Sequence, residues 1–427
     1  MTISRHPNIS ARGLVALALL GALLAPAIAQ AAAGSLDRSF GGDGKVTTNF
    51  VGLHEDAATA VAVDPRGRIV AVGAAAPSHQ FSQGFALARY RPNGHLDRSF
   101  SHNGKVSTRI GTEAAGSSVA IDSRGRITVA GPSCHSYPDC DFALARYRRN
   151  GSLDRSFSGD GKATTDFGSG GANSMAIDSR NRVVVAGGTT DSYAGGEFAL
   201  ARYKPNGSLD PSFGAGGKVT TDFGGGHGAT DVAVDSRGRI VAAGYSGGDF
   251  ALARYKPNGS LDPSFGAGGK VTTDFGGVRD DATSVAIDFR DRIVAAGGRF
   301  TRDGGDADFA LARYWRNGSL DNSFGADGEV TTDFGVDDGS AQAVTIDSRR
   351  RIVAAGIRWK GYGDGRFALD RYNSDGSLDR SFSRNGKVAK PEAIANAVAI
   401  DSKGQIVAAG NSSVSRNSRF RLARYIG

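Results

Sequence analysis

The feature that most constrains the fold of this 427-residue chain is a sequence unit that recurs seven times. The block Leu-Asp-x-Ser-Phe begins at Leu36, Leu96, Leu153, Leu209, Leu261, Leu320 and Leu378. An aliphatic-Asp block with a following apolar run has its Asp at Asp64, Asp122, Asp178, Asp235, Asp288, Asp347 and Asp401. A block of the type Phe-Ala-Leu-Ala-Arg-Tyr begins at Phe85, Phe142, Phe198, Phe250, Phe309, Phe367 and Phe420. Such a period is typical of proteins that repeat one supersecondary unit.

Each unit contains four strand-like runs, which we term the A, B, C and D strands, and it lacks helical periodicity. In one copy the runs are Asp231–Val234, Arg239–Ala243, Phe250–Tyr255 and Lys270–Phe275. Tight-turn residues separate A from B and C from D. Large and small residues alternate on the A strands, and the B strands are apolar on both faces, so each sheet can pack between two others.

Seven four-stranded antiparallel sheets that pack face to face predict an all-β fold, a seven-bladed β-propeller. A parallel β-helix is the alternative, but one rung of a β-helix does not need four strands and two hairpin turns. The chain opens with a lone D-type strand, Lys45–Phe50, and ends with a C-type strand, Phe420–Tyr425. We therefore expect the ring to be closed by the N-terminal strand pairing with the C-terminal blade, which also covers exposed strand edges.

The three blocks resemble those of bacterial delta-60 repeat proteins, and the resemblance covers nearly all of the chain after the N-terminal segment. It implies a propeller and implies no activity. One copy departs from the pattern, because Ala389-Lys390-Pro391 replaces Thr-Thr-Asp. We expect the D strand of blade six to fray there.

The N-terminal segment has the order of a secretory signal peptide. Arg5 and Arg12 precede an apolar run from Leu14 to Leu24, and small residues up to Ala31 offer cleavage sites. We expect residues 1–33 to be a cleaved signal peptide, residues 34–427 to form the single propeller, and the protein to be secreted or periplasmic. The apolar run is too short for a comfortable membrane span, so no membrane insertion is expected.

Charge and cysteine usage narrow the classes of partner. The 51 basic and 43 acidic residues are spread along the chain without a Lys/Arg block, so we expect no nucleic-acid partner. Cys134 and Cys140 are the two cysteines, and in an oxidising compartment they are expected to form a local disulfide. A zinc site is the alternative, with His135 and Asp139 as the nearby ligands.

The A–B turns and C–D connections are nearly invariant, whereas the B–C and D–A loops differ among the copies. In an up-and-down blade these two classes lie at opposite ends, so we expect all the variation on one face, where repeat proteins often bind. Aromatic residues beside charges predict a recognition surface for a protein or a glycan. The candidate binding residues are Trp359, Tyr362, Arg358, Phe300, Tyr245, Tyr193, Tyr137, His227 and His54. Solvated loops without a ligand are the alternative.

Repeated polar residues are interpreted as structural. The Asp of each A–B turn is expected to cap its hairpin, and the Arg of each C strand to pair with a repeated Asp. No cofactor motif occurs, and we predict no cofactor, no metal site and no catalytic residue, although Asp303–Asp308 loosely resembles a calcium loop. The alternative is a lyase or hydrolase that uses His54, His135, His227 and carboxylates such as Glu55 at the axial funnel. A monomer is expected.

Overall fold

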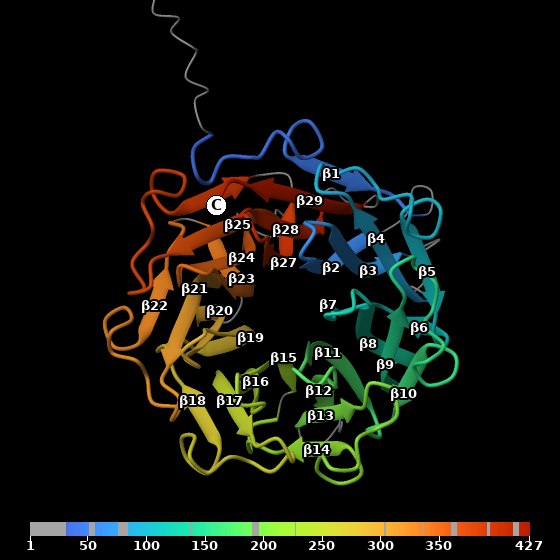
Figure 1. Cartoon of the computed structure of the whole chain (residues 1–427). Helices are drawn as coiled ribbons and strands as arrows, with labels where there is room; N and C mark the ends of the chain where they lie inside the picture. Colours follow the sequence, from blue (N-terminus) through green and yellow to red (C-terminus); the bar gives the residue numbers. More distant parts are fainter. Residues whose placement is uncertain are drawn as a thin grey trace, which may run out of the picture. The chain divides into compact units, whose positions relative to one another are not determined.

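The structure, a computed structural model, describes residues 31–50, 56–75, 84–136, 139–189, 196–226, 228–302, 305–335, 337–359, 365–390, 393–412 and 418–427. Residues from Ala32 to Gly427 form one compact unit. Its seven antiparallel sheets are arranged as blades around a central axis (Figure 1). The described residues contain strands and no helix, so the predicted all-β, seven-bladed propeller is confirmed.

Blades 1 to 6 follow one another along the chain. Blade 1 comprises β2 (Asp56–Val63), β3 (Ile69–Ala75), β4 (Gly84–Tyr90) and β5 (Lys105–Arg109). Blade 2 comprises β6 (Glu113–Ala114), β7 (Ser118–Ile121), β8 (Ile127–Ser136), β9 (Asp139–Tyr147) and β10 (Lys162–Thr165). Blade 3 comprises β11 (Gly170–Ile177), β12 (Val183–Thr189), β13 (Phe198–Tyr203) and β14 (Lys218–Thr221). Blade 4 comprises β15 (Ala229–Val234), β16 (Ile240–Ser246), β17 (Asp249–Tyr255) and β18 (Lys270–Thr273). Blade 5 comprises β19 (Arg279–Ile287), β20 (Ile293–Arg302), β21 (Gly305–Tyr314) and β22 (Glu329–Thr332). Blade 6 comprises β23 (Asp338–Ile346), β24 (Ile352–Trp359), β25 (Gly365–Tyr372) and β26 (Lys387–Lys390).

Blade 7 draws its strands from both ends of the chain. It contains β27 (Ile394–Ile400), β28 (Ile406–Asn411) and β29 (Phe420–Tyr425), and β1 (Lys45–Thr48) pairs antiparallel with β29 (Figure 1). The Gly34 N–H donates to the Ile426 carbonyl over 2.8 Å, and the Ile426 N–H donates to the Ser35 carbonyl over 2.9 Å. In blade 2 the Gly151–Arg148 and Arg148–Ser152 pairs make the same two bonds within the C–D turn. The chain ends therefore meet where the other blades have a continuous turn.

The hydrophobic core lies between neighbouring blades, where large side chains meet small ones. Phe250 and Leu252 of β17 belong to the same buried cluster as Ala310 and Ala312 of β21. All four side chains are fully buried. This complementarity between large and small side chains lets neighbouring sheets approach one another closely.

Each A–B turn is held by its repeated Asp, as predicted. Asp235 Oδ1 accepts hydrogen bonds from the backbone N–H groups of Arg237 at 2.9 Å and Arg239 at 2.8 Å. Its other oxygen accepts from the Arg239 guanidinium. The same pattern occurs at Asp64, Asp122, Asp178, Asp288 and Asp347.

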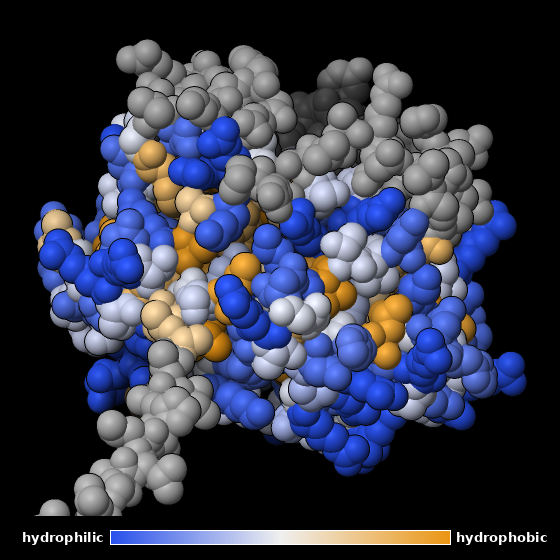
Figure 2. Space-filling view, turned by 90° about the horizontal axis from the view of Figure 1, so that it is seen from above, coloured by the Kyte–Doolittle hydropathy of each residue, from blue (hydrophilic) through white to orange (hydrophobic). Residues whose placement is uncertain are grey.

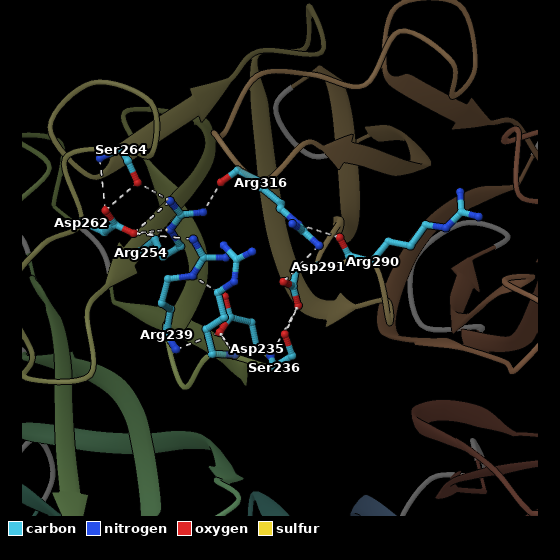
Figure 3. A network of polar contacts seen from close by, with 10 residues as sticks. Asp235, Ser236, Arg239, Arg254, Asp262, Ser264, Arg290, Asp291 and Arg316 are labelled. Carbon is cyan, nitrogen blue, oxygen red and sulfur yellow. Dashed lines mark hydrogen bonds and ion pairs between the residues drawn. The ribbon is translucent and has the colours of Figure 1, made fainter.

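The Arg of each C strand is buried with the Asp of the Leu-Asp-x-Ser-Phe block, which confirms the predicted pairing. In blade 4, Arg254 Nε donates to Asp262 Oδ2 over 3.0 Å, and Arg254 also donates to the carbonyl of Arg316 in blade 5 (Figure 3). Its guanidinium lies 4.7 Å from the Phe265 ring centroid. Burial by itself raises the pKa of Asp262, but hydrogen bonds from Ser264 and the Arg254 charge bring that pKa below its usual value. The blocks recognised in the sequence are thus structural joints between blades.

A β-bulge interrupts the A strand in most blades. In blade 4 the register shifts between Ala229 and Asp231, so the strand begins earlier than the predicted Asp231. The bulged residue, Thr230, donates through Oγ1 to the Ala282 carbonyl of blade 5 over 2.7 Å. Thr283 and Asn396 make equivalent bonds to the next blade at 2.7 and 2.8 Å. The bulge therefore turns a polar side chain toward the neighbouring blade.

Blade 6 differs from the sequence-based expectation in its D strand and from the other blades in its C strand. The prediction that its D strand frays is wrong for residues 387–390, because β26 pairs with β25 at four positions, as many as β14 makes with β13. Residues 391 and 392 lie outside the described residues. In the C strand, Asp370 replaces the Ala of the other copies, and its side chain is fully buried.

Candidate functional site

The two ends of the blades differ in character. The side of the molecule seen in Figure 2 is mostly hydrophilic, with hydrophobic residues in small separate areas. We term the end that carries the A–B turns and C–D connections the constant face. We term the opposite end, which carries the B–C hairpin tips and D–A segments, the variable face.

The nine candidate binding residues divide into two groups. Tyr245, Phe300, Arg358 and Trp359 are described and lie near the ends of B strands on the variable face. The other five lie outside the described residues, and their placement stays a prediction: His54, Tyr137, Tyr193, His227 and Tyr362.

Arg279 brings two of the predicted residues together. Its guanidinium lies 5.8 Å from the Tyr245 ring centroid and 5.1 Å from the Phe300 ring centroid. It also donates to Asp281 over 2.7 Å, while its side chain stays 57% exposed. Burial raises the pKa of the Tyr245 hydroxyl, and the Asp281 carboxylate adds to that rise. The result is a fixed, exposed cation between two rings at the junction of blades 4 and 5.

Trp359 and Arg358 end the B strand of the next blade. Trp359 pairs with Asp338 of β23 and Gly365 of β25, so its backbone belongs to the sheet and not to a loop. Arg358 forms an ion pair with Asp337 at 3.0 Å. The Ala307 N–H of β21 donates to Asp338 Oδ1 over 3.1 Å, which joins the hairpin of blade 5 to the edge of blade 6. Phe300 and Trp359 therefore lie on neighbouring, connected blades.

Three carboxylates also converge on the variable face. Ligand oxygens of Asp249, Asp274 and Asp280 lie within 4.8 Å of one another. Asp280 is fully buried, and burial, followed by the Asp274 and Asp249 charges, raises its pKa to about 6. Within the described part of the chain, this is the group of carboxylates that could hold a metal ion.

The prediction that all variation falls on one face is wrong, because blade 5 carries two unusual aromatic residues on its constant face. Phe289 stands where most copies have Ser, and its side chain is 70% exposed. Trp315 follows the C strand and is 44% exposed. A cavity of about 470 Å³ beside Trp315 is lined by Arg290, Arg292, Trp315, Arg316, Asn317 and Ser319. A comparison of each repeat position across the copies would have revealed both residues.

A small apolar pocket lies where the sequence of blade 6 departs from the repeat after its D strand. It holds about 90 Å³ and lies between blades 6 and 7, next to Phe367, Ile394 and Tyr425. In other blades a Phe that follows the D strand covers this place, as Phe275 does over Phe250 with ring centroids 4.8 Å apart. Glu392 occupies the corresponding sequence position in blade 6. The pocket is therefore a packing defect large enough only for a small group.

The remaining candidates concern the cysteines and histidines. Cys134 and Cys140 are joined by a disulfide across the β8–β9 hairpin, where they are directly opposed. His135 is exposed beside this disulfide. His54, Glu55 and His227 lie outside the described residues, so a catalytic site at the funnel stays a prediction. His95 and His102 lie in the C–D connection of the constant face.

Comparisons with known proteins concern the fold. Among solved structures, the chain is similar to the extracellular domain of a putative one component system from B. thetaiotaomicron, with a TM-score of 0.47 and 13% identity. The match covers 89% of this chain, which spans only 40% of the length of that protein. A protein from Lactobacillus plantarum gives a TM-score of 0.48 and 11% identity, over 83% of this chain and 98% of that one. An unknown function protein from Dyadobacter fermentans gives a TM-score of 0.44 and 10% identity, over 90% of this chain and 99% of that one. A comparison with curated proteins found no match. The described residues include no helix able to cross a membrane.

The family comparison matches the repeats themselves. A model described as domain of unknown function (DUF5122) beta-propeller matches residues 67–100, 125–157, 181–213, 238–265, 291–324 and 350–382. Each stretch begins at or near the A–B turn and ends at the Phe of the Leu-Asp-x-Ser-Phe block. The corresponding seventh stretch is divided between residues 404–427 and 32–40, so a continuous match cannot form there. The chain is therefore a seven-bladed propeller in which six stretches of the repeat match the DUF5122 beta-propeller model.

Proposed function

We propose that this propeller is an exported, non-catalytic recognition protein that binds a protein partner through its variable face. The observation that carries the proposal is the Tyr245–Arg279–Phe300 stack, with Trp359 and Arg358 on the adjoining blade. Tyr, Trp and Arg are the residue types that dominate the binding energy of protein interfaces. Here they sit on paired strands, which reduces the ordering that binding requires.

The pairing of the arginines favours a protein over a glycan. Arg279 is held beside Asp281, and Arg358 lies beside Asp337. The faces of Tyr245 and Phe300 that meet Arg279 are already covered, which leaves less free ring surface for stacking on a sugar. An exposed arginine beside aromatic rings instead suits an acidic or backbone-carbonyl group on a partner chain. Export depends on the predicted signal peptide, whose residues lie almost entirely outside the described chain.

The test is capture of a partner by matched surface variants. The chain from Ala32 to Gly427 is immobilised and exposed to the secreted and envelope proteins of the producing organism, and bound proteins are identified by mass spectrometry. Each identified partner is then purified and its affinity is measured against Arg279→Ala and Trp359→Ala. We expect each variant to weaken binding at least about tenfold, because truncation of a central Arg or Trp removes ~2 kcal/mol or more.

Trp315→Ala is the matched control, because it removes an exposed Trp from the opposite face. Binding that survives Arg279→Ala and Trp359→Ala but is lost in Trp315→Ala would refute the assignment to the variable face. A glycan array probed with the same four proteins addresses the other ligand class. A glycan signal that depends on Trp359, with no protein partner retained, would replace the protein proposal.

A further inference from the structure

One repeat position changes the sign of its charge in a single blade. The first residue of the D strand is lysine in six copies, Lys45, Lys105, Lys162, Lys218, Lys270 and Lys387, and glutamate in the remaining one, Glu329. Glu329 begins β22 of blade 5, so it occupies the same backbone position as the lysines.

These lysines connect neighbouring blades. In blade 3, Lys218 Nζ donates to the Asp166 carbonyl of blade 2 over 3.0 Å. In blade 6, Lys387 Nζ donates to the Asp333 carbonyl of blade 5 over 2.6 Å. The ammonium also faces the next Phe of that neighbour, as Lys387 Nζ does at 4.9 Å from the Phe334 ring centroid. A positive charge therefore normally lies at this point of each junction. At the junction of blades 4 and 5, the corresponding residue of the neighbour is Asp274.

The residues around this junction are acidic. Oxygens of Asp249, Asp274 and Asp280 lie within 4.8 Å of one another. Burial, followed by the charges of Asp274 and Asp280, raises the pKa of Glu329. Burial and Asp274 likewise raise the pKa of Asp249. Three aspartates with converging oxygens, together with Glu329 at the repeat position of the lysines, thus stand where the other junctions place an ammonium group.

Asp280 adds an independent observation. Its side chain is fully buried and directed at the other carboxylates. Oδ2 accepts a hydrogen bond from the Phe275 N–H at 2.7 Å, and the Gly277 N–H also acts on this carboxylate, but among the described residues Oδ1 is buried without a partner in hydrogen-bond geometry. An unsatisfied oxygen of a buried carboxylate is costly unless another donor or a cation meets it.

The junction of blades 7 and 1 provides an internal comparison. Asp56 is buried there like Asp280, and its Oδ2 accepts from the Phe50 N–H at 2.7 Å. The residues around Asp56 can be compared with those around Asp280 by repeat position. Lys105 occupies the position of Glu329, Arg419 that of Asp249, and Asn49 that of Asp274. The junction of Asp56 therefore has two cationic residues at these positions, whereas the junction of Asp280 has three further carboxylates.

We propose that Asp249, Asp274, Asp280 and Glu329 form a calcium site at the junction of blades 4 and 5. Calcium prefers six to eight oxygen ligands at roughly 2.3–2.6 Å, and oxygens at opposite sides of such an ion are about 4.6–5.2 Å apart. The oxygens of Asp249, Asp274 and Asp280 lie within 4.8 Å of one another, which is close enough for them to share one such ion. The ion would supply the positive charge that lysine supplies elsewhere, and the Asp274 carbonyl, the counterpart of the lysine acceptor, would be a further ligand. This site would be structural, and it does not depend on the proposed partner.

The test uses the chain from Ala32 to Gly427 after treatment with EDTA. Calorimetric titration with CaCl₂ should show one bound ion with a Kd of about 0.1–1 mM, as in extracellular calcium modules. Saturating calcium should raise the Tm by about 2–4 °C over a NaCl control of equal ionic strength. A titration with MgCl₂ identifies the ion, and a response to magnesium alone would overturn the assignment to calcium.

The decisive variant is Glu329→Lys, which restores the residue of the other copies and is expected to fold. It should abolish the calcium response and melt above the wild type in EDTA. Asp274→Asn should weaken calcium binding at least about tenfold, because each ligand charge tunes affinity. Asp222→Asn is the control: Asp222 occupies the same repeat position in blade 3 and accepts from Gly224 at 2.6 Å, as Asp274 does from Gly276. Equal calcium responses in all four proteins, or none in the wild type, would overturn the proposal.

Discussion

At the scale of single residues, the positions where one copy departs from the repeat say most about function and stability. Residues present in every copy, such as Arg254 and Asp262, are buried and connect blades. Glu329, Phe289, Trp315 and Asp370 each occur in one copy only. The first three lie at surfaces or junctions with an unusual charge or exposure. Asp370 instead lies inside blade 6, where the structure gives a direct expectation for stability.

Asp370→Ala should stabilise the protein at neutral pH. Burial raises the pKa of Asp370 to about 7 from an ordinary value of 3.8. Between these values the folded protein binds a proton that the unfolded chain does not, so the free energy of unfolding falls as the pH rises from about 4 to 7. The variant removes this dependence and should gain roughly 2–4 kcal/mol at pH 8 relative to pH 4. Denaturant unfolding across this pH range measures it.

The control for this prediction is Asp375→Ala in the same blade. Asp375 is exposed, and hydrogen bonds from Ser377 lower its pKa, so its removal should leave the slope between pH 4 and 7 unchanged. Parallel curves for the wild type and Asp370→Ala would show that the buried carboxyl does not govern this slope.

At the scale of strands, β1 should contribute strongly to stability. It pairs with β29 at four positions, Phe50 contacts Phe420 with ring centroids 4.8 Å apart, and the Tyr90 hydroxyl donates to Thr48. Removal of residues 1–50 exposes the edge of β29 and should cost several kcal/mol, at about 0.5–1.5 kcal/mol for each hydrogen bond. Thermal melting followed by circular dichroism tests this against a chain that begins at Ala32. An unchanged Tm would contradict the expectation, and a peptide of residues 32–50 should restore the loss.

The strands also show how far the sequence could predict the molecule. The number of blades, the A–B caps and the Arg–Asp pairs follow from residues that recur in fixed order. The start of β15 at Ala229 could not be predicted in this way, because the bulge at Thr230 breaks the alternation on which the predicted start depended. Among the candidate binding residues, Trp359 and Phe300 could be placed by loop variability alone. Their partners, Asp338 beside Trp359 and Arg279 beside Phe300, required the register of three neighbouring strands.

At the scale of the whole molecule, the joined ends predict where the signal peptide is removed. The Ala33 carbonyl accepts a hydrogen bond from the Ser383 N–H over 2.9 Å, so residue 33 already belongs to the propeller. Cleavage after Ala31 or Ala29 preserves this bond, whereas cleavage after Ala33 removes it. We therefore expect the mature protein to begin at Ala32 or Gln30, which moves the boundary of the signal peptide upstream of the residue 33 expected from the sequence. N-terminal sequencing of the exported protein decides this, and a mature chain that begins at Gly34 would contradict it.

The meeting of Gly34 with Ile426 also fixes how the molecule can be presented to its surroundings. Both ends leave from the rim of the C–D connections, on the side away from the hairpins that carry Trp359 and Phe300. An immobilising tag or a fusion partner attached at either end would therefore lie next to the constant face. The variable face would point away from the attachment point and stay accessible to a large binding partner.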